Sequence, residues 1–154
     1  MDVPKEQRAP LEQILNESFE GWYLRHSKGI LKDSETVRAA ISSGQPVGLI
    51  IPKTLGPGIG YVYYLAVAKA HRRKGVARTL LDDALGRFRA EGISEVFTSV
   101  EEDNTPSAEL FAAEGFVRTS FAEVSKRYGP LRAINMYRMM VAVPGEVLLH
   151  KSVG

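Results

Sequence analysis

The sequence contains no cysteine, which excludes disulfides, thiolate metal sites and a cysteine nucleophile. It also lacks any apolar run close to the roughly 20 residues that a membrane-spanning helix needs. The first ten residues, MDVPKEQRAP, have no apolar centre of the kind found in a secretory signal. We therefore expect a cytoplasmic protein with no metal site and no membrane partner.

A large excess of charge of one sign is missing as well. The net charge of +2 is too small to indicate a nucleic-acid partner by itself. A length of 154 residues with 44% hydrophobic residues is typical of one folded core rather than two. We expect a single domain over 1–154, with residues 1–9 poorly ordered and a C-terminal tail over 144–154.

Strand and helix patterns alternate in the middle of the chain, which predicts an α/β fold with a mixed sheet flanked by helices. The expected elements, in order, are a helix over 10–22, a hairpin of strands 36–41 and 46–52, a strand over 60–67, a helix over 75–91, a strand over 93–100, a short helix over 105–114, and a strand pair over 116–124 and 134–143. A loop containing Tyr128, Gly129 and Pro130 would join the last two strands.

The most informative segment is a basic turn between the strand at 60–67 and the helix that follows. Its sequence is Arg72-Arg73-Lys74-Gly75-Val76-Ala77. The first N–H groups of a helix have no partner within it, and the helix dipole adds partial positive charge there. Glycine allows close approach to the backbone, and the basic side chains add charge-assisted hydrogen bonds. The turn therefore predicts a site for a pyrophosphate-like anion, with an ordinary basic loop before a helix as the alternative.

Two motifs in this region resemble those of a known superfamily. Arg72-x-x-Gly75-x-Ala77, after a strand ending Leu65-Ala66-Val67, resembles the acetyl-CoA signature Q/R-x-x-G-x-G/A of the GNAT acetyltransferases. The segment from Val100 to Phe116, VEEDNTPSAELFAAEGF, resembles the second CoA motif of the same superfamily. The downstream motif is most similar to that of ribosomal-protein and N-terminal acetyltransferases. Both motifs occur in order and at the usual separation, so the resemblance is specific.

The resemblance implies a GNAT-like fold, in which the strands at 60–67 and 93–100 splay apart and admit the pantetheine arm of acetyl-CoA. It implies transfer of an acetyl group to a primary amine by direct attack, the acceptor being a peptide or protein amine or a small-molecule amine. The residues that it places at the cofactor are Leu65, Ala66, Val67, Arg72, Arg73, Lys74, Gly75, Val76, Ala77, Arg78, Asn104, Ser107 and Phe111. For Asn104 the alternative is a simple turn and helix-start role.

The acid and base of the better-known members are missing from their usual places. A phenylalanine, Phe111, stands where the resemblance expects a proton-donating tyrosine, and Ser99 and Tyr61 stand where it expects a glutamate base. Strand alternation suggests Glu101 and Tyr63 as replacements, because Glu101 shares a strand face with Ser99. Further titratable candidates, which the sequence does not place, are His26, His71, Tyr23 and Tyr128.

Two other functions are compatible with the same residues. The missing acid and base are what a non-catalytic acyl-CoA-binding sensor or interaction module would show. The run His71-Arg72-Arg73-Lys74 can contact nucleic-acid phosphates, but no groove-reading element accompanies it, so we expect no nucleic-acid partner. The apolar segment Val147-Leu148-Leu149 indicates either a homodimer contact or packing on its own domain.

Overall fold

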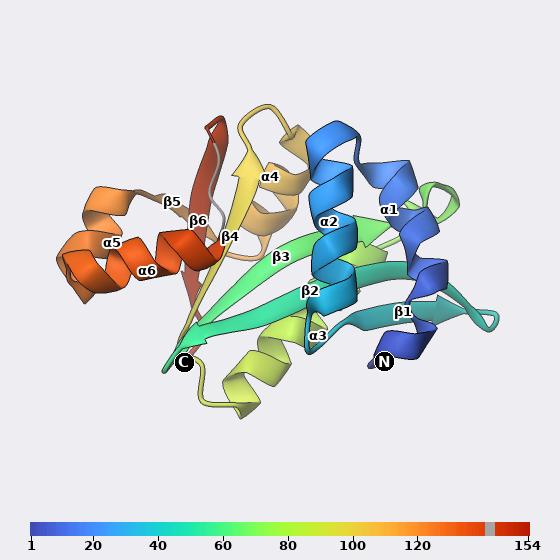
Figure 1. Cartoon of the computed structure of the whole chain (residues 1–154), viewed down its shortest axis with the longest axis horizontal. Helices are drawn as coiled ribbons and strands as arrows, with labels where there is room; N and C mark the ends of the chain where they lie inside the picture. The colour runs from blue at the N-terminus through green and yellow to red at the C-terminus, as the bar shows by residue number, and fades with distance from the viewer. Residues whose placement is uncertain (141–143) are drawn as a thin grey trace. The chain divides into compact units, whose positions relative to one another are not determined.

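The computed structural model describes residues 1–140 and 144–154, and Figure 1 shows its helices and strands. Six strands and helices on both faces of them confirm the predicted α/β class. The chain divides into two compact units, one of Met1–Lys53 with Val62–Arg87 and one of Thr54–Tyr61 with Phe88–Gly154.

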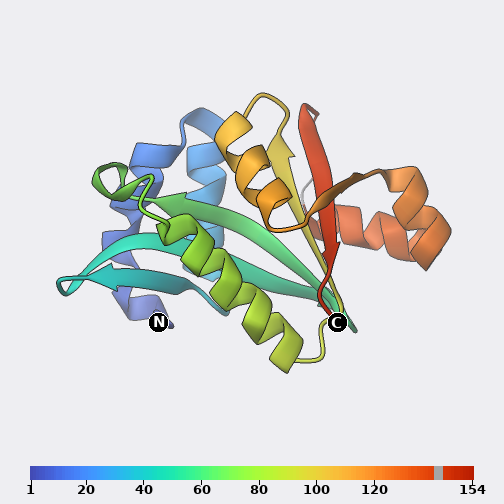
Figure 2. The same ribbon diagram turned by 180° about the vertical axis from the view of Figure 1, so that it is seen from behind.

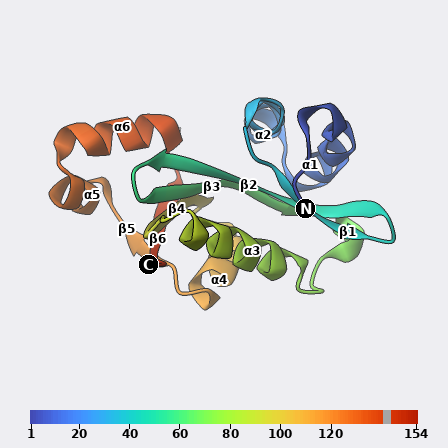
Figure 3. The ribbon, with the colours of Figure 1, turned by 90° about the horizontal axis from the view of Figure 1, so that it is seen from below.

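The first unit holds the predicted anion-binding turn. Its strands are β1 (Arg38–Ser42), most of β2 (Gln45–Gly56) and the later part of β3 (Ile59–Val67), in that order across the sheet. Helices α1 (Glu12–Ser18) and α2 (Gly21–Asp33) cover one face of these strands, and α3 (Val76–Ala90) covers the other (Figures 2 and 3). Leucines and isoleucines from the short 3-10 turn η2 (Ala9–Leu11), α1, α2 and β2 form the core under α1 and α2, among them Leu11, Leu15, Leu31, Leu49 and Ile51.

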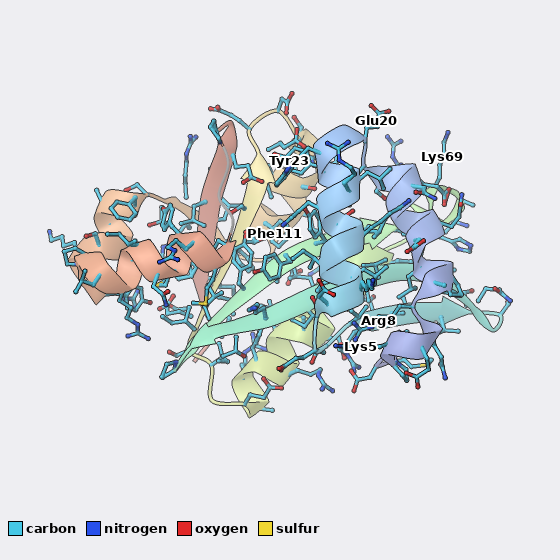
Figure 4. All side chains as sticks on the ribbon, viewed as in Figure 1. Lys5, Arg8, Glu20, Tyr23, Lys69 and Phe111 are labelled. Carbon is cyan, nitrogen blue, oxygen red and sulfur yellow. The ribbon has the colours of Figure 1, made fainter. Side chains whose placement is uncertain are left out.

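The first nine residues are part of this unit, although the sequence suggested poor order. The buried guanidinium of Arg8 donates to the carbonyls of Val3 (3.0 Å), Leu31 (2.8 Å) and Ser34 (2.6 Å). It lies where α2 ends (Figure 4). The polar composition of the N-terminal segment gives no sign of this role. The role depends on tertiary contacts between Arg8 and the carbonyls at the end of α2.

The predicted hairpin of strands 36–41 and 46–52 is confirmed as β1 and β2. The strands pair antiparallel, with Ala39 opposite Leu49 and Ser42 opposite Gln45. Ser43 and Gly44 form the two-residue turn, and both have positive φ, 51° and 77°. Two-residue hairpin turns with positive φ at both positions match the right-handed twist of the strands.

The second unit is built on β4 (Glu95–Glu101), β6 (Glu146–Ser152) and β5 (Val117–Thr119), in that order, with both pairings antiparallel. Helix α4 (Thr105–Ala113) lies on one face, and α5 (Phe121–Tyr128) and α6 (Pro130–Met140) lie on the other (Figure 3). The predicted strand at 93–100 and the predicted short helix are therefore confirmed as β4 and α4.

The predicted strand pair over 116–124 and 134–143 is wrong. Only Val117–Thr119 is a strand, and α5 and α6 occupy the rest of the described segment; residues 141–143 lie outside the described residues. Gly129, with φ of 90°, ends α5, and Pro130 begins α6. Glycine after a helix and proline at the first helical position form a helix-to-helix connection as readily as a strand-to-strand turn.

The residues expected to form a C-terminal tail, 144–154, contain β6, which lies between β4 and β5. Val147, Leu148 and Leu149 pair with Val100, Ser99 and Thr98 of β4. Of the two interpretations of this apolar segment, the structure shows packing on its own unit. An apolar strand with a partner on each side is an interior strand, which explains why the segment is apolar.

Candidate functional site

The turn between β3 and α3 has the backbone geometry of an anion site. After a short 3-10 turn, η3 (Lys69–His71), the chain takes positive φ at Arg73 (62°) and Gly75 (82°). The amide of Thr79 donates to the carbonyl of Gly75 at 3.0 Å, which places Gly75 at the helix start. The amides of Val76 and Ala77 therefore belong to the first turn of α3, where backbone N–H groups have no intrahelical acceptor.

Gly75 is the position that keeps this turn open. A Cβ atom built there would meet nothing within 4 Å, so the space above its backbone is empty of described protein atoms. The positive φ accounts for the glycine itself, since L side chains are disfavoured in that conformation. A phosphate group can therefore approach the backbone of the turn without displacing a side chain.

Arg72 makes hydrogen bonds that fix the shape of the turn. Its Nε donates to the carbonyl of Val67 (3.0 Å), and its Nη2 donates to the carbonyl of Glu17 (2.9 Å) and to Ser18 Oγ (3.3 Å). These bonds connect the turn to the end of β3 and to the last turn of α1. The neighbouring side chains of Arg73 and Lys74 are exposed and supply positive charge at the turn. The sequence placed Arg72 among the phosphate ligands, and that role stays a prediction.

The end of β3 leads directly into this turn. Ala66 and Val67 are buried and Leu65 is partly buried, as the apolar strand pattern predicted. Tyr63 and Tyr64 are consecutive, yet both pack against the core under α1 and α2.

Tyr63 is half-buried in β3, with Lys53 Nζ 6.0 Å from the centre of its ring. Burial raises the pKa of the Tyr63 hydroxyl. The phenol is therefore protonated at neutral pH, which suits it to donate a proton rather than to accept one.

A cluster of rings on α2 and β3 was not predicted as a unit. His26 Nδ1 lies 2.6 Å from the hydroxyl of Tyr64, and the imidazole stacks on Trp22 with ring centres 4.7 Å apart and planes at 8°. Phe19 packs edge-on against Tyr64 at 5.2 Å. Tyr23, in the first turn of α2, packs edge-on against Trp22 (Figure 4). Helical spacing of Trp22 and His26 was visible in the sequence, but the contact with Tyr64 depends on the tertiary fold.

In the second unit, Asn104 has the helix-start role that was the alternative to cofactor contact. Its Oδ1 accepts from the amide of Ser107 at 3.3 Å, and it caps α4. Phe111 is buried and packs edge-on against Phe116, with ring centres 5.1 Å apart. An apolar ring in this position cannot donate a proton, and the identity of the general acid stays a prediction.

Ser99 and Tyr61, the two residues at the expected glutamate positions, contact each other. The Tyr61 hydroxyl donates to Ser99 Oγ at 2.9 Å. The register of β4 with β6 sets Ser99 opposite Leu148 and Glu101 opposite Glu146, so Ser99 and Glu101 share one strand face, as predicted.

A pocket of about 280 Å³ opens on this face of the second unit. Its walls combine strand residues with the beginning of α5 and one residue of α6: Ser99, Arg118, Thr119, Ser120, Phe121, Tyr137, Glu146, Val147 and Leu148. Phe121 and Tyr137 pack edge-on at 4.9 Å, and burial raises the pKa of Tyr137. The pocket therefore offers an aromatic wall, hydroxyl groups and one carboxylate to a small ligand.

The predicted site residues thus fall into two groups. The first unit brings together Tyr63, Leu65, Ala66, Val67, Arg72, Arg73, Lys74, Gly75, Val76, Ala77 and Arg78; the second unit holds Glu101, Asn104, Ser107 and Phe111. Within residues 1–140 and 144–154, no group of three or more metal-ligating side chains is found. In the same part of the chain, no helix has the length and hydropathy to cross a membrane.

Comparison with known proteins agrees with the geometry of the turn. The family model described as "Acetyltransferase (GNAT) family" matches residues 5–116. A mycothiol acetyltransferase of Catenulispora acidiphila is 37% identical over 65 residues, which are 42% of this chain and 20% of that protein. An L-2,4-diaminobutyric acid acetyltransferase of Streptomyces anulatus is 33% identical over 107 residues, which are 64% of this chain and 56% of that protein.

The fold is also that of solved acetyltransferases. The ribosomal-protein-S18-alanine N-acetyltransferase of Escherichia coli superposes with a TM-score of 0.75 at 12% identity, covering 100% of this chain and 92% of that one. The chain spans only about a fifth, 20 to 22%, of the length of three of the curated relatives that it matches. The family match covers most of the chain and includes both predicted motifs up to Phe116. The chain belongs to the GNAT family of acetyltransferases.

Proposed function

We propose that this protein is an acetyl-CoA-dependent N-acetyltransferase that moves the acetyl group to a primary amine by direct attack. The observation that carries the proposal is the β3–α3 turn, with positive φ at Arg73 and Gly75 and open space above Gly75. The family match supplies the cofactor class.

The diphosphate of acetyl-CoA would sit on this turn. Backbone amides at the start of α3, including those of Val76 and Ala77, would donate to its oxygens, and the helix dipole would favour its charge. Arg73, Lys74 and Arg78 would add positive charge, while Arg72 holds the turn against Val67 and α1. The pantetheine arm would then follow the β3 backbone at Leu65 to Val67, where one N–H would stabilise the oxyanion of the tetrahedral intermediate.

The proton transfers need a donor for the leaving thiolate and an acceptor for the amine proton. Tyr63 is the proposed donor, because burial keeps its hydroxyl protonated. Glu101, on the same strand face as Ser99, is one candidate acceptor, the one that strand alternation predicts. Asn104, Ser107 and Phe111 stay predictions as cofactor contacts.

The acceptor is a primary amine of a peptide or of a small molecule. The names of the relatives include a diamino acid acetyltransferase and a protein-alanine acetyltransferase, so both classes belong in a test. An α-amino group, with a pKa near 7.7–8.0, needs roughly 1 kcal/mol to lose its proton at pH 7, whereas lysine needs about 4.6 kcal/mol. With no strong base in the usual places, we favour an acceptor with an α-amine.

The test is release of free CoA from acetyl-CoA in the presence of peptide N-termini, lysine peptides, diamino acids, polyamines and amino sugars. Because the chain has no cysteine, a thiol reagent would report only the thiol of CoA. We expect turnover with one acceptor class and none in the double variant Arg73→Ala/Gly75→Asp, which removes a positive charge and adds a negative one at the turn.

Gly44→Asp is the matched control for this variant. Gly44 also has positive φ, and a Cβ built there would likewise meet nothing within 4 Å, but it lies in the β1–β2 turn. It should therefore reproduce the backbone strain and the added charge while leaving turnover intact. Binding of acetyl-CoA without transfer to any amine would contradict the enzyme and favour the acyl-CoA-binding sensor.

A cytoplasmic location and a homodimer stay predictions. The first is checked by fractionation of cells that express the protein at its natural level. The second is checked by sedimentation equilibrium, in which a single species of monomer mass would contradict it.

A further inference from the structure

The contact between His26 and Tyr64 lies inside the unit that holds the cofactor turn. The 2.6 Å separation of His26 Nδ1 and the Tyr64 hydroxyl is a short hydrogen bond between two proton-transferring groups. Tyr64 immediately precedes Leu65, where the proposed pantetheine path begins. The hydrogen bond therefore connects α2 to the strand position next to the proposed thioester.

The surroundings of His26 hold its ring in one orientation. Trp22 stacks on the imidazole in a nearly parallel arrangement, and the Tyr64 hydroxyl fixes Nδ1. Nε2, on the opposite side of the ring, is left as the nitrogen for a ligand. His26 is only partly buried, and its neighbour Trp22 is 42% exposed, so a ligand can reach this part of α2.

We propose that His26 is the catalytic proton acceptor of the transfer reaction and that Tyr64 positions it. This inference rests on the proposed acetyltransferase function. When Nδ1 carries the hydrogen and donates to the Tyr64 hydroxyl, Nε2 holds a lone pair that can take a proton. The arrangement supplies a base in a chain that lacks a glutamate at Ser99 and Tyr61.

The step balances without an added reactant. The amine nitrogen of the acceptor forms a bond to the thioester carbonyl carbon, and one N–H proton passes to His26 Nε2. The C–S bond breaks, and the thiolate leaves with the electron pair and takes a proton from the Tyr63 hydroxyl. The imidazolium and the Tyr63 phenolate then return to their starting states through solvent.

The protonation state of His26 at neutral pH agrees with this role. Burial lowers the pKa of the imidazole, because the charged form is less well solvated. The titratable side chain that contacts the imidazole from β3 is Tyr64, and from α2 itself the nearby titratable groups are Tyr23 and Arg25. No ionised partner contributes to the shift, so the ring is neutral above its lowered pKa.

The experiment compares His26→Gln and Tyr64→Phe with wild type, using acetyl-CoA and the acceptor found in the panel. General-base removal should lower kcat roughly 10²-fold in His26→Gln, while the Kd for acetyl-CoA stays the same. The kcat of wild type should rise with pH through an ionisation whose pKa lies below 6.5. This rising limb of the pH profile should be missing in His26→Gln. Free imidazole should restore part of the activity of His26→Ala. In Tyr64→Phe the limb should remain with a smaller loss of kcat.

Lys32→Gln is the control for changes to the helix, because Lys32 is exposed on α2 more than one turn from His26. An unchanged kcat or an unchanged pH limb in His26→Gln would overturn the inference while leaving the acetyltransferase intact. Loss of the limb in Glu101→Gln instead would assign the base to β4 and would also overturn it. If wild type transfers nothing to any amine, the proposed function itself fails, and the role of His26 fails with it.

Discussion

Gly60 and Gly86 differ in whether the structure requires a glycine at that position. Gly60, in β3, lies against the ring of Phe88, and a Cβ built there would come within 2.8 Å of the ring. Gly86, in the interior of α3, would place a Cβ in open space. The first glycine is required by close packing, whereas the second only adds flexibility to a helix.

We expect Gly60→Ala to destabilise the protein by about 1–3 kcal/mol, because the buried Phe88 ring must shift to admit a methyl group. Gly86→Ala should stabilise it by about 0.5–1 kcal/mol, since alanine is the better helix former. Urea unfolding of both variants measures the two free energies. Equal effects of the same sign would contradict this interpretation of the packing at Gly60.

Arg8 shows what the sequence could not reveal at the scale of one residue. Its pKa is lowered by burial, and Glu6 only partly offsets this. The guanidinium is bonded to backbone carbonyls rather than to a carboxylate, including that of Glu35 at 3.3 Å. A pattern of charges gives no sign of such bonds. Gly75, in contrast, could be assigned from its motif, and its positive φ favours glycine.

Arg8→Met should destabilise the protein by roughly 2–4 kcal/mol, because several carbonyls that accept from a charged group lose their donor. The measurement is chemical unfolding at pH 7. Lys5→Met is the matched control, since Lys5 is exposed in the same segment and should change stability by less than about 0.5 kcal/mol. A similar loss in both variants would mean that the N-terminal segment is sensitive to any substitution.

At the scale of elements, the sequence predicted β1 to β4, α3 and α4 because in each of them the spacing of apolar residues and the residues at the ends indicate the same kind of element. It failed at α5 and α6, where Gly129-Pro130 was interpreted as a strand connection. A usable signal was present: Ser120 followed by Glu123 is the S-x-x-E pattern of a helix start, and Ser120 Oγ accepts from the Glu123 amide at 3.2 Å. The pocket could not be predicted, because its walls come from strands and helices far apart in the chain.

The buried carboxylate of Glu95 links α5 to the sheet of the second unit. Arg127 of α5 donates to it at 2.7 Å, and Ser152 of β6 donates at 2.6 Å. Burial raises the pKa of Glu95, but the bonds from Ser152 and Arg127 outweigh it and leave the pKa below its usual value. A carboxylate with a lowered pKa stabilises the folded state when it is ionised.

This link should make stability depend on pH in a defined window. The contribution of Glu95 is complete above its unfolded-state pKa, near 4.5, and is lost as pH falls through the lower folded-state pKa. We expect the Tm of wild type to fall more steeply below pH 4.5 than that of Glu95→Gln. The exposed Glu91→Gln should follow wild type. Parallel curves for wild type and Glu95→Gln would contradict the role of the carboxylate.

At the scale of the whole molecule, the proposed cofactor should act as a stabilising ligand. A ligand that binds only the folded state at 100 times its Kd adds about 2.7 kcal/mol, which for a chain of this size raises Tm by roughly 5–10 °C. Thermal melts with and without acetyl-CoA measure the shift. The Arg73→Ala/Gly75→Asp variant should show none, and Gly44→Asp should keep it.

The interior place of β6 has a consequence for the order in which the molecule assembles. Its pairing partners, β4 and β5, are both translated earlier, and neither neighbours the other in the sheet. A nascent chain that ends before Glu146 therefore exposes β4 and β5 as edges, which can pair wrongly or with other chains. Closure of this half of the protein must wait for long-range contacts, which slow folding and lengthen the time for which these edges are exposed.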